Sequence, residues 1–110
     1  LLMNPGDGML MTDPGYPCNR HFLRLVEGEG QLVPVGVEDR FQLHAEKAEK
    51  YWQNNTIGAM VASPANPTGE ILSKDELSEL WSLCQHKNGH VVVDEIYHGL
   101  NYGTEAPSIL

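Results

Sequence analysis

The sequence of 110 residues has little cysteine, few basic side chains and no long hydrophobic run. Its two cysteines, Cys18 and Cys84, lie far apart without a CxxC spacing, so we expect free thiols in a reducing compartment. Seven lysines and arginines stand against fifteen aspartates and glutamates, which leaves a net charge of −8. This charge argues against a nucleic-acid partner and against an anionic membrane surface.

The hydrophobic segments are too short for a membrane protein. No apolar run reaches the roughly 20 residues that a transmembrane helix needs, and no basic-then-apolar signal segment is visible. With 41% hydrophobic and 20% charged residues, the composition is typical of a globular domain. We therefore expect a cytoplasmic unit of at most one domain. Neither end shows the polar taper of many free termini, so we expect a piece of a longer chain.

Short apolar segments alternate with helical patterns along the chain. The expected strands are residues 8–13, 31–36, 57–63 and 90–95, and the expected helices are residues 18–27 and 42–53 and a third helix that begins at Ser73 and ends at residues 87–89. Pro34 makes the second strand an edge strand or an irregular one. Strands that alternate with helices of this length predict βαβ units and a parallel sheet.

The third helix has the clearest signals. Ser73 and Glu76 form an S-x-x-E capping box, in which each side chain satisfies a backbone amide of the first turn. We predict that Leu77, Leu80, Trp81 and Cys84 form one apolar face of this helix, because they are spaced at i, i+3, i+4 and i+7.

Polar residues with distinctive chemistry follow three of the four expected strands. Residues 13–17 (DPGYP) follow the first strand, residues 63–67 (SPANP) follow the third, and Asp94 and Tyr97 follow the fourth. Ligands in open α/β sheets bind beyond the carboxyl ends of the strands, so these side chains are expected to converge there. The valines 91–93 indicate a strand buried on both faces, and a charge at its end is costly without a partner.

Several interpretations of these residues are open at this point. Four apolar residues before Asp-Glu resemble a Walker B strand, but the GxxxxGK[ST] loop is missing. His86 and His90 are four residues apart, yet Asn88-Gly89 breaks the helix that would align them, and no metal site is predicted. Asp94 can simply cap a following helix, and Asn66-Pro67 can simply shape a turn.

Taken together, the motifs resemble the class I/II aminotransferases, which are fold-type I pyridoxal-phosphate enzymes. The resemblance is carried by DPGYP (13–17), NPTGE (66–70) and VVDEIYHGLNY (92–102), which occur in the family's order. NPGDGMLMTDPGYP also matches the entry into that family's cofactor domain. The resemblance implies a three-layer αβα fold with a mostly parallel sheet, of which this chain is the central part of the large domain.

The resemblance also implies a cofactor, pyridoxal 5′-phosphate, and assigns it four residues. Asp94 would face the pyridine nitrogen and keep it protonated. Tyr97 and Asn66 would donate hydrogen bonds to the ring's phenolate oxygen, and Tyr16 would stack on the ring.

Other parts of the family's active site are not found in the sequence. The family's imine-forming lysine follows a Ser-x-x-Lys-like string, and none of Lys47, Lys50, Lys74 and Lys87 matches it. The Gly-rich phosphate loop, the arginine that grips the substrate carboxylate and the small domain are also absent. The resemblance therefore implies that residues 1–110 are a fragment of the cofactor-binding domain and are inactive alone.

The parent protein is expected to be a homodimeric transaminase that moves an amino group between an amino acid and a 2-oxo acid. One alternative is another fold-type I pyridoxal-phosphate enzyme, such as a C–S β-lyase, because such enzymes share Asp94, Tyr97 and Asn66. The other is a non-catalytic folded fragment or an interaction module.

Overall fold

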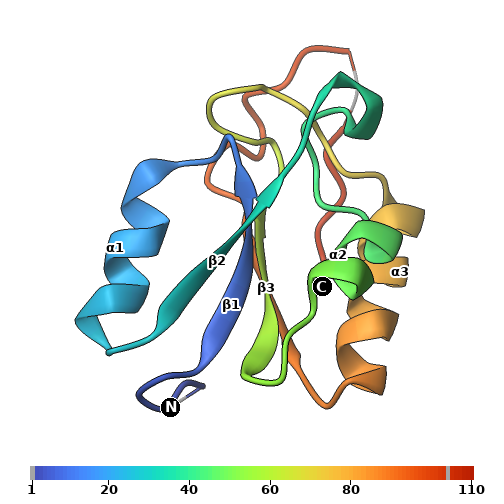
Figure 1. The fold of residues 1–110 in the computed structure, drawn as a ribbon. Helices are drawn as coiled ribbons and strands as arrows, with labels where there is room; N and C mark the ends of the chain where they lie inside the picture. Colours follow the sequence, from blue (N-terminus) through green and yellow to red (C-terminus); the bar gives the residue numbers. More distant parts are fainter. Residues whose placement is uncertain (1, 104) are drawn as a thin grey trace.

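The computed structural model describes residues 2–103 and 105–110 as one four-stranded sheet with helices on both faces (Figure 1). The strands are β1 (Gly8–Asp13), β2 (Glu29–Pro34), β3 (Thr56–Ala62) and β4 (His90–Asp94). The helices are α1 (Pro17–Leu25), the short 3-10 helix η1 (Val37–Asp39), α2 (Ala45–Tyr51) and α3 (Lys74–His86). All neighbouring strands are parallel, in the order β2-β1-β3-β4.

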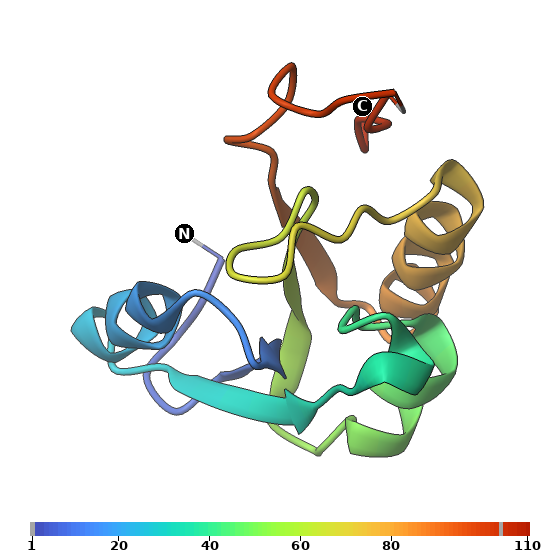
Figure 2. The ribbon, with the colours of Figure 1, turned by 90° about the horizontal axis from the view of Figure 1, so that it is seen from above.

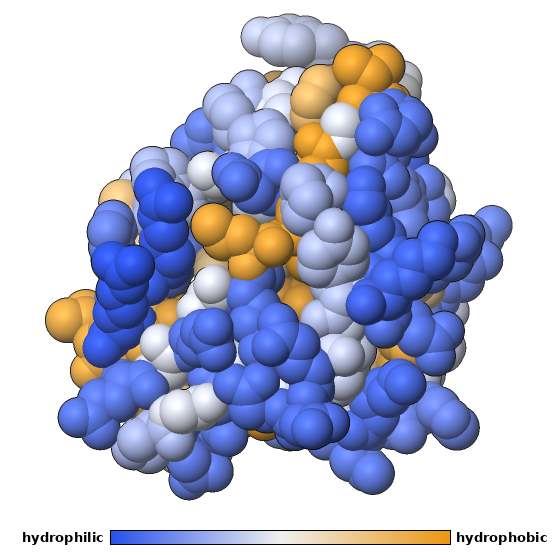
Figure 3. Space-filling model, in the orientation of Figure 1, coloured by the Kyte–Doolittle hydropathy of each residue, from blue (hydrophilic) through white to orange (hydrophobic). Residues whose placement is uncertain are grey.

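The chain forms three layers, as the family resemblance implied. Helix α1 covers one face of the sheet, and α2 and α3 cover the other (Figure 2). Successive residues of β1 alternate between the two faces, because side chains of a strand point to opposite sides. Met9 and Met11 pack with Leu23 of α1, whereas Leu10 joins the larger core that includes Leu80 of α3. Within the described residues, no helix is long and apolar enough to cross a membrane. Hydrophilic residues cover most of the face seen in Figure 3, with separate hydrophobic patches between them.

The first two helices differ in extent from the prediction. The helix expected over residues 18–27 begins one residue earlier, because Pro17 suits the first helical position. The helix expected over residues 42–53 is confined to α2, because η1 and the left-handed backbone of Arg40 and Phe41 precede it. Their φ angles are 50° and 53°, a region that residues other than glycine rarely adopt.

Helix α3 begins as predicted, with a complete capping box. The Ser73 hydroxyl accepts a hydrogen bond from the Glu76 amide at 3.3 Å, and the Glu76 carboxylate accepts one from the Ser73 amide at 2.7 Å. Leu77, Leu80 and Cys84 are buried, and burial raises the pKa of the Cys84 thiol to about 11. Both cysteines are free, as expected.

Two details of burial were predicted incorrectly. Trp81 does not share the buried face of α3, since 49% of it is exposed. The three valines of β4 are only half-buried, not enclosed on both faces. The reason is the strand order: β4 is the last strand of this sheet and pairs with β3 alone. The prediction that β2 is an edge strand is correct.

Candidate functional site

The carboxyl ends of all four strands lie at one edge of the sheet, at the top of Figure 1. At this edge Ala62 of β3 pairs with Asp94 of β4. The loop after β3 contacts the segment after β4 at this edge. The contact joins the Asn66 side-chain nitrogen to the Tyr97 hydroxyl oxygen, at 3.5 Å. A cavity of about 540 Å³ is lined by both segments, including Asn66, Tyr97 and Leu100.

The loop that carries Asn66 is closed by its own backbone. The Ala65 amide donates to the Glu70 carbonyl at 2.9 Å, and the Gly69 amide donates to the Ala65 carbonyl at 2.7 Å. Gly69 has a φ of 77°, which glycine adopts without steric cost. The interpretation that Asn66-Pro67 shapes a turn is confirmed, because these hydrogen bonds close the loop around it.

Asp94 is half-buried and has a local hydrogen bond. Its Oδ1 atom accepts from the Ile96 amide at 3.1 Å, a pattern typical of Asp in turns. No helix follows Asp94 in the described residues, so the helix-cap interpretation is wrong. Among residues 2–103 and 105–110, no basic side chain forms an ion pair with Asp94. The carboxylate can therefore accept a cationic partner.

Tyr16 lies at the N-cap of α1 and is 42% exposed. A hydrogen bond with the Cys18 thiol raises the pKa of the Tyr16 phenol above its ordinary value. Partial desolvation and the nearby Tyr97 and Asp94 raise this pKa further. Tyr16 follows the end of β1, and Asp94 and Tyr97 lie at and after the end of β4, so all three residues belong to the carboxyl edge of the parallel sheet.

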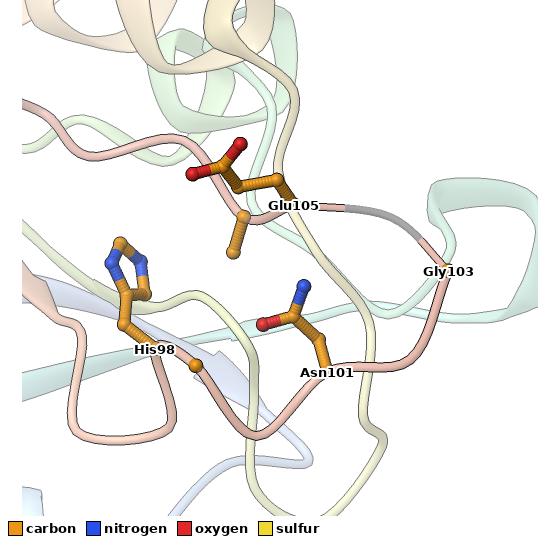
Figure 4. A pocket seen from close by; sticks show the side chains of 6 residues that line it. His98, Asn101, Gly103 and Glu105 are labelled. Carbon is orange, nitrogen blue, oxygen red and sulfur yellow. The ribbon is translucent and has the colours of Figure 1, made fainter.

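A second cavity, of about 480 Å³, was not predicted (Figure 4). It is formed by the segment after Tyr97, and the side chains of His98, Asn101 and Glu105 line it. The His98 Nδ1 atom lies 3.6 Å from the Glu95 carboxylate, and its Nε2 atom is buried without a hydrogen-bond partner in the described part of the chain.

Glu95 is another residue whose role the sequence did not reveal. Its carboxylate accepts hydrogen bonds from the Ile109 amide at 2.8 Å and from the Ser108 hydroxyl at 3.0 Å. These contacts attach the C-terminal segment to the end of β4. The only signal in the sequence was the DE pair, which does not identify partners 13 and 14 residues away.

We expect the docking of residues 108–110 to weaken in acid. The Ile109 amide, followed by the Ser108 hydroxyl and the charge of His98, lowers the pKa of Glu95 below its ordinary value of 4.5, although desolvation opposes the shift. A carboxyl group whose pKa is lower in the folded state than in the unfolded state stabilises the fold at pH values above its unfolded-state pKa. This stabilisation is lost as the pH falls through its folded-state pKa. In a pH titration by nuclear magnetic resonance, the Ile109 amide should shift with a midpoint below 4.5. Glu95→Gln should abolish this step, and a midpoint above the ordinary value would contradict the assignment.

Comparison with known proteins extends over nearly the whole chain. The family described as "Aminotransferase class I and II" matches residues 1–109. A valine–pyruvate aminotransferase of Mycobacterium tuberculosis is 39% identical over 97 residues, which are 88% of this chain and 25% of that protein. The 1-aminocyclopropane-1-carboxylate synthase 7 of Arabidopsis thaliana is 33% identical over 107 residues, 90% of this chain and 24% of that protein.

The fold is also shared with a solved structure. The aspartate aminotransferase of Thermus thermophilus superimposes with a TM-score of 0.91 at 29% identity, over 98% of this chain and 28% of the other. The chain thus spans about a quarter of the length of these proteins. Because the family's sequence pattern covers all but the last residue and the fold agrees, the chain belongs to the class I and II aminotransferases.

Proposed function

We propose that the chain contributes the pyridine-ring side of a pyridoxal 5′-phosphate site in an aminotransferase. The reaction moves an amino group between an amino acid and a 2-oxo acid. One observation carries the proposal: Asn66 and Tyr97 meet at the carboxyl edge of the sheet, beside an Asp94 that has no cationic partner among the described residues.

The chemistry of these side chains fits the cofactor. When bound, pyridoxal phosphate supplies a ring that withdraws electrons from a substrate losing its Cα proton. Asp94 holds a proton on the ring nitrogen through a charge-assisted hydrogen bond. The Tyr97 hydroxyl and the Asn66 amide are donors for the ring's phenolate oxygen. Tyr16 supplies an aromatic face, and stacking contributes about 1 kcal/mol.

The remaining parts of the site belong to a longer protein in this proposal. The chain covers about a quarter of its relatives, and its lysines do not match the family's imine-forming lysine. We therefore place residues 1–110 within the cofactor-binding domain of a longer enzyme, and we propose that this enzyme is cytoplasmic and homodimeric. The phosphate loop, the lysine and the small domain come from chain outside these residues.

A second reaction is supported by the relatives themselves. A protein named 1-aminocyclopropane-1-carboxylate synthase matches at 33% identity, so sequence similarity alone does not select transamination. The four proposed cofactor residues serve either reaction, because both need a protonated ring that withdraws electrons. The substrate and the product, rather than these residues, distinguish the two reactions.

The full-length protein tests the proposal. It should bind pyridoxal phosphate stoichiometrically, and amino acids should convert the cofactor to pyridoxamine phosphate while a 2-oxo acid accumulates. Absorbance spectra and chromatography of the 2-oxo acid measure both events. Release of a cyclic amino acid without pyridoxamine phosphate would favour the second reaction. A protein that binds no cofactor would refute both.

A further inference from the structure

We infer that Gln42 is a positioning residue that holds the Asn66 loop in place for the cofactor. The inference rests on the proposed function, because it assigns the loop its cofactor contact. Gln42 lies between η1 and α2, outside the sequence motifs that carry the family resemblance, and only 1% of its surface is exposed. Burying a side-chain amide costs free energy unless the amide is hydrogen-bonded, so the hydrogen-bond partners of Gln42 indicate what it does in the fold.

Both partners of Gln42 are backbone carbonyls at the two ends of the Asn66 loop. The Gln42 side-chain nitrogen donates to the Ala62 carbonyl at 3.1 Å and to the Glu70 carbonyl at 2.9 Å. Ala62 is the last residue of β3, and Glu70 follows the loop. A single NH₂ group, with its two hydrogens, therefore bridges the base of residues 63–69.

These contacts connect Gln42 to the proposed cofactor residues. The Glu70 carbonyl also accepts from the Ala65 amide, next to Asn66. At the other end of the loop, the Ser63 amide donates to the Asp94 carbonyl at 3.0 Å. Asn66 contacts Tyr97, which comes from the segment after β4. The position of Asn66 relative to Tyr97 therefore depends on how the base of the loop is fixed.

The backbone conformation before Gln42 supports its role in positioning the Asn66 loop. Arg40 and Phe41 both adopt left-handed conformations immediately before it, and such residues persist only where the surrounding structure holds them. Arg40 also forms ion pairs with Glu70 and Glu76. Its side chain is 48% exposed, however, and exposed ion pairs contribute little. The buried amide of Gln42 is therefore the stronger restraint on the loop.

A matched control exists at the opposite edge of the sheet. Gln31 is also buried, and its amide donates to Asn55 at 2.9 Å and accepts from Thr56. These contacts lie at the amino end of β3, away from the Asn66 loop. Gln42→Met and Gln31→Met each replace a buried amide with an apolar side chain of similar size. Gln42→Leu, which also removes the amide without adding a charge, replaces Gln42→Met if that variant does not fold.

The first experiment measures amide hydrogen exchange in the full-length protein. In Gln42→Met, exchange of the Ala65 and Gly69 amides should rise about tenfold relative to Val61 of β3, as expected for losing about one hydrogen bond. Gln31→Met should leave this ratio unchanged. No change in Gln42→Met, or the same change in both variants, would overturn the inference.

The second experiment measures the bound cofactor in the full-length protein. The pH midpoint of its visible absorbance band should move in Gln42→Met in the same direction as in Asn66→Ala, and should stay at the wild-type value in Gln31→Met. A midpoint that moves in Asn66→Ala but not in Gln42→Met would overturn the positioning role. If the protein binds no pyridoxal phosphate, the proposed function and the cofactor role of Gln42 both fail, whereas the exchange ratio still decides whether Gln42 holds the loop.

Discussion

Asp94→Asn should reduce the turnover of the full-length enzyme by at least about 100-fold, the usual scale for removing a group that stabilises developing charge. Substrate affinity should change only a few-fold, because the carboxylate acts mainly when negative charge develops on the substrate carbon. The neutral amide cannot keep the ring nitrogen protonated, so the ring withdraws electrons less strongly. Single-turnover kinetics with a Cα-deuterated substrate measures the proton-abstraction step directly.

An exposed aspartate provides the control for this substitution. Asp75 lies in the first turn of α3, and Asp75→Asn removes the same charge away from the proposed site. Its turnover should stay within about two-fold of wild type, since exposed charges act weakly over distance. If Asp94→Asn leaves the proton-abstraction rate within a few-fold of wild type, Asp94 does not act on the ring nitrogen.

The 110-residue chain alone should not attach pyridoxal phosphate covalently at one site, and it should not transaminate. Covalent attachment needs an amine that is held near the cofactor and activated. Lys47, Lys50 and Lys87 instead pair with Asp39, Glu46 and Glu49, respectively. The Lys50 ammonium donates a hydrogen bond to Glu46, which raises the pKa of Lys50 and favours its protonated, unreactive form. The fourth lysine, Lys74, is the first residue of α3.

Borohydride trapping followed by peptide mapping tests this prediction. We expect low labelling spread over several lysines, because surface amines form weak, exchangeable imines with the free aldehyde. The full-length protein, treated in parallel, is the positive control and should show one fully labelled lysine outside residues 1–110. Stoichiometric labelling of one lysine in the short chain, with conversion to the pyridoxamine form by an amino acid, would show that the chain is a complete catalyst.

Local patterns in the sequence predicted where the strands and helix α3 lie along the chain. The capping box of Ser73 and Glu76 was predictable because its hydrogen bonds join residues three apart. The four strands were predictable from apolar runs bounded by turn residues. Their parallel arrangement followed from the alternation with helices. The convergence of Asn66 and Tyr97 was predictable in outline, because carboxyl ends of parallel strands share an edge.

Only the tertiary structure decided the strand order and the contacts between distant residues. The half-burial of the valines in β4 depends on β4 being an end strand, which no local pattern specifies. Gln42 reaches carbonyls 20 and 28 residues away, and Glu95 holds an amide 14 residues away. Both are ordinary polar residues in the sequence. The partners in these three contacts are backbone groups, which every residue carries, so the sequence has no side-chain signal for them and packing alone selects them.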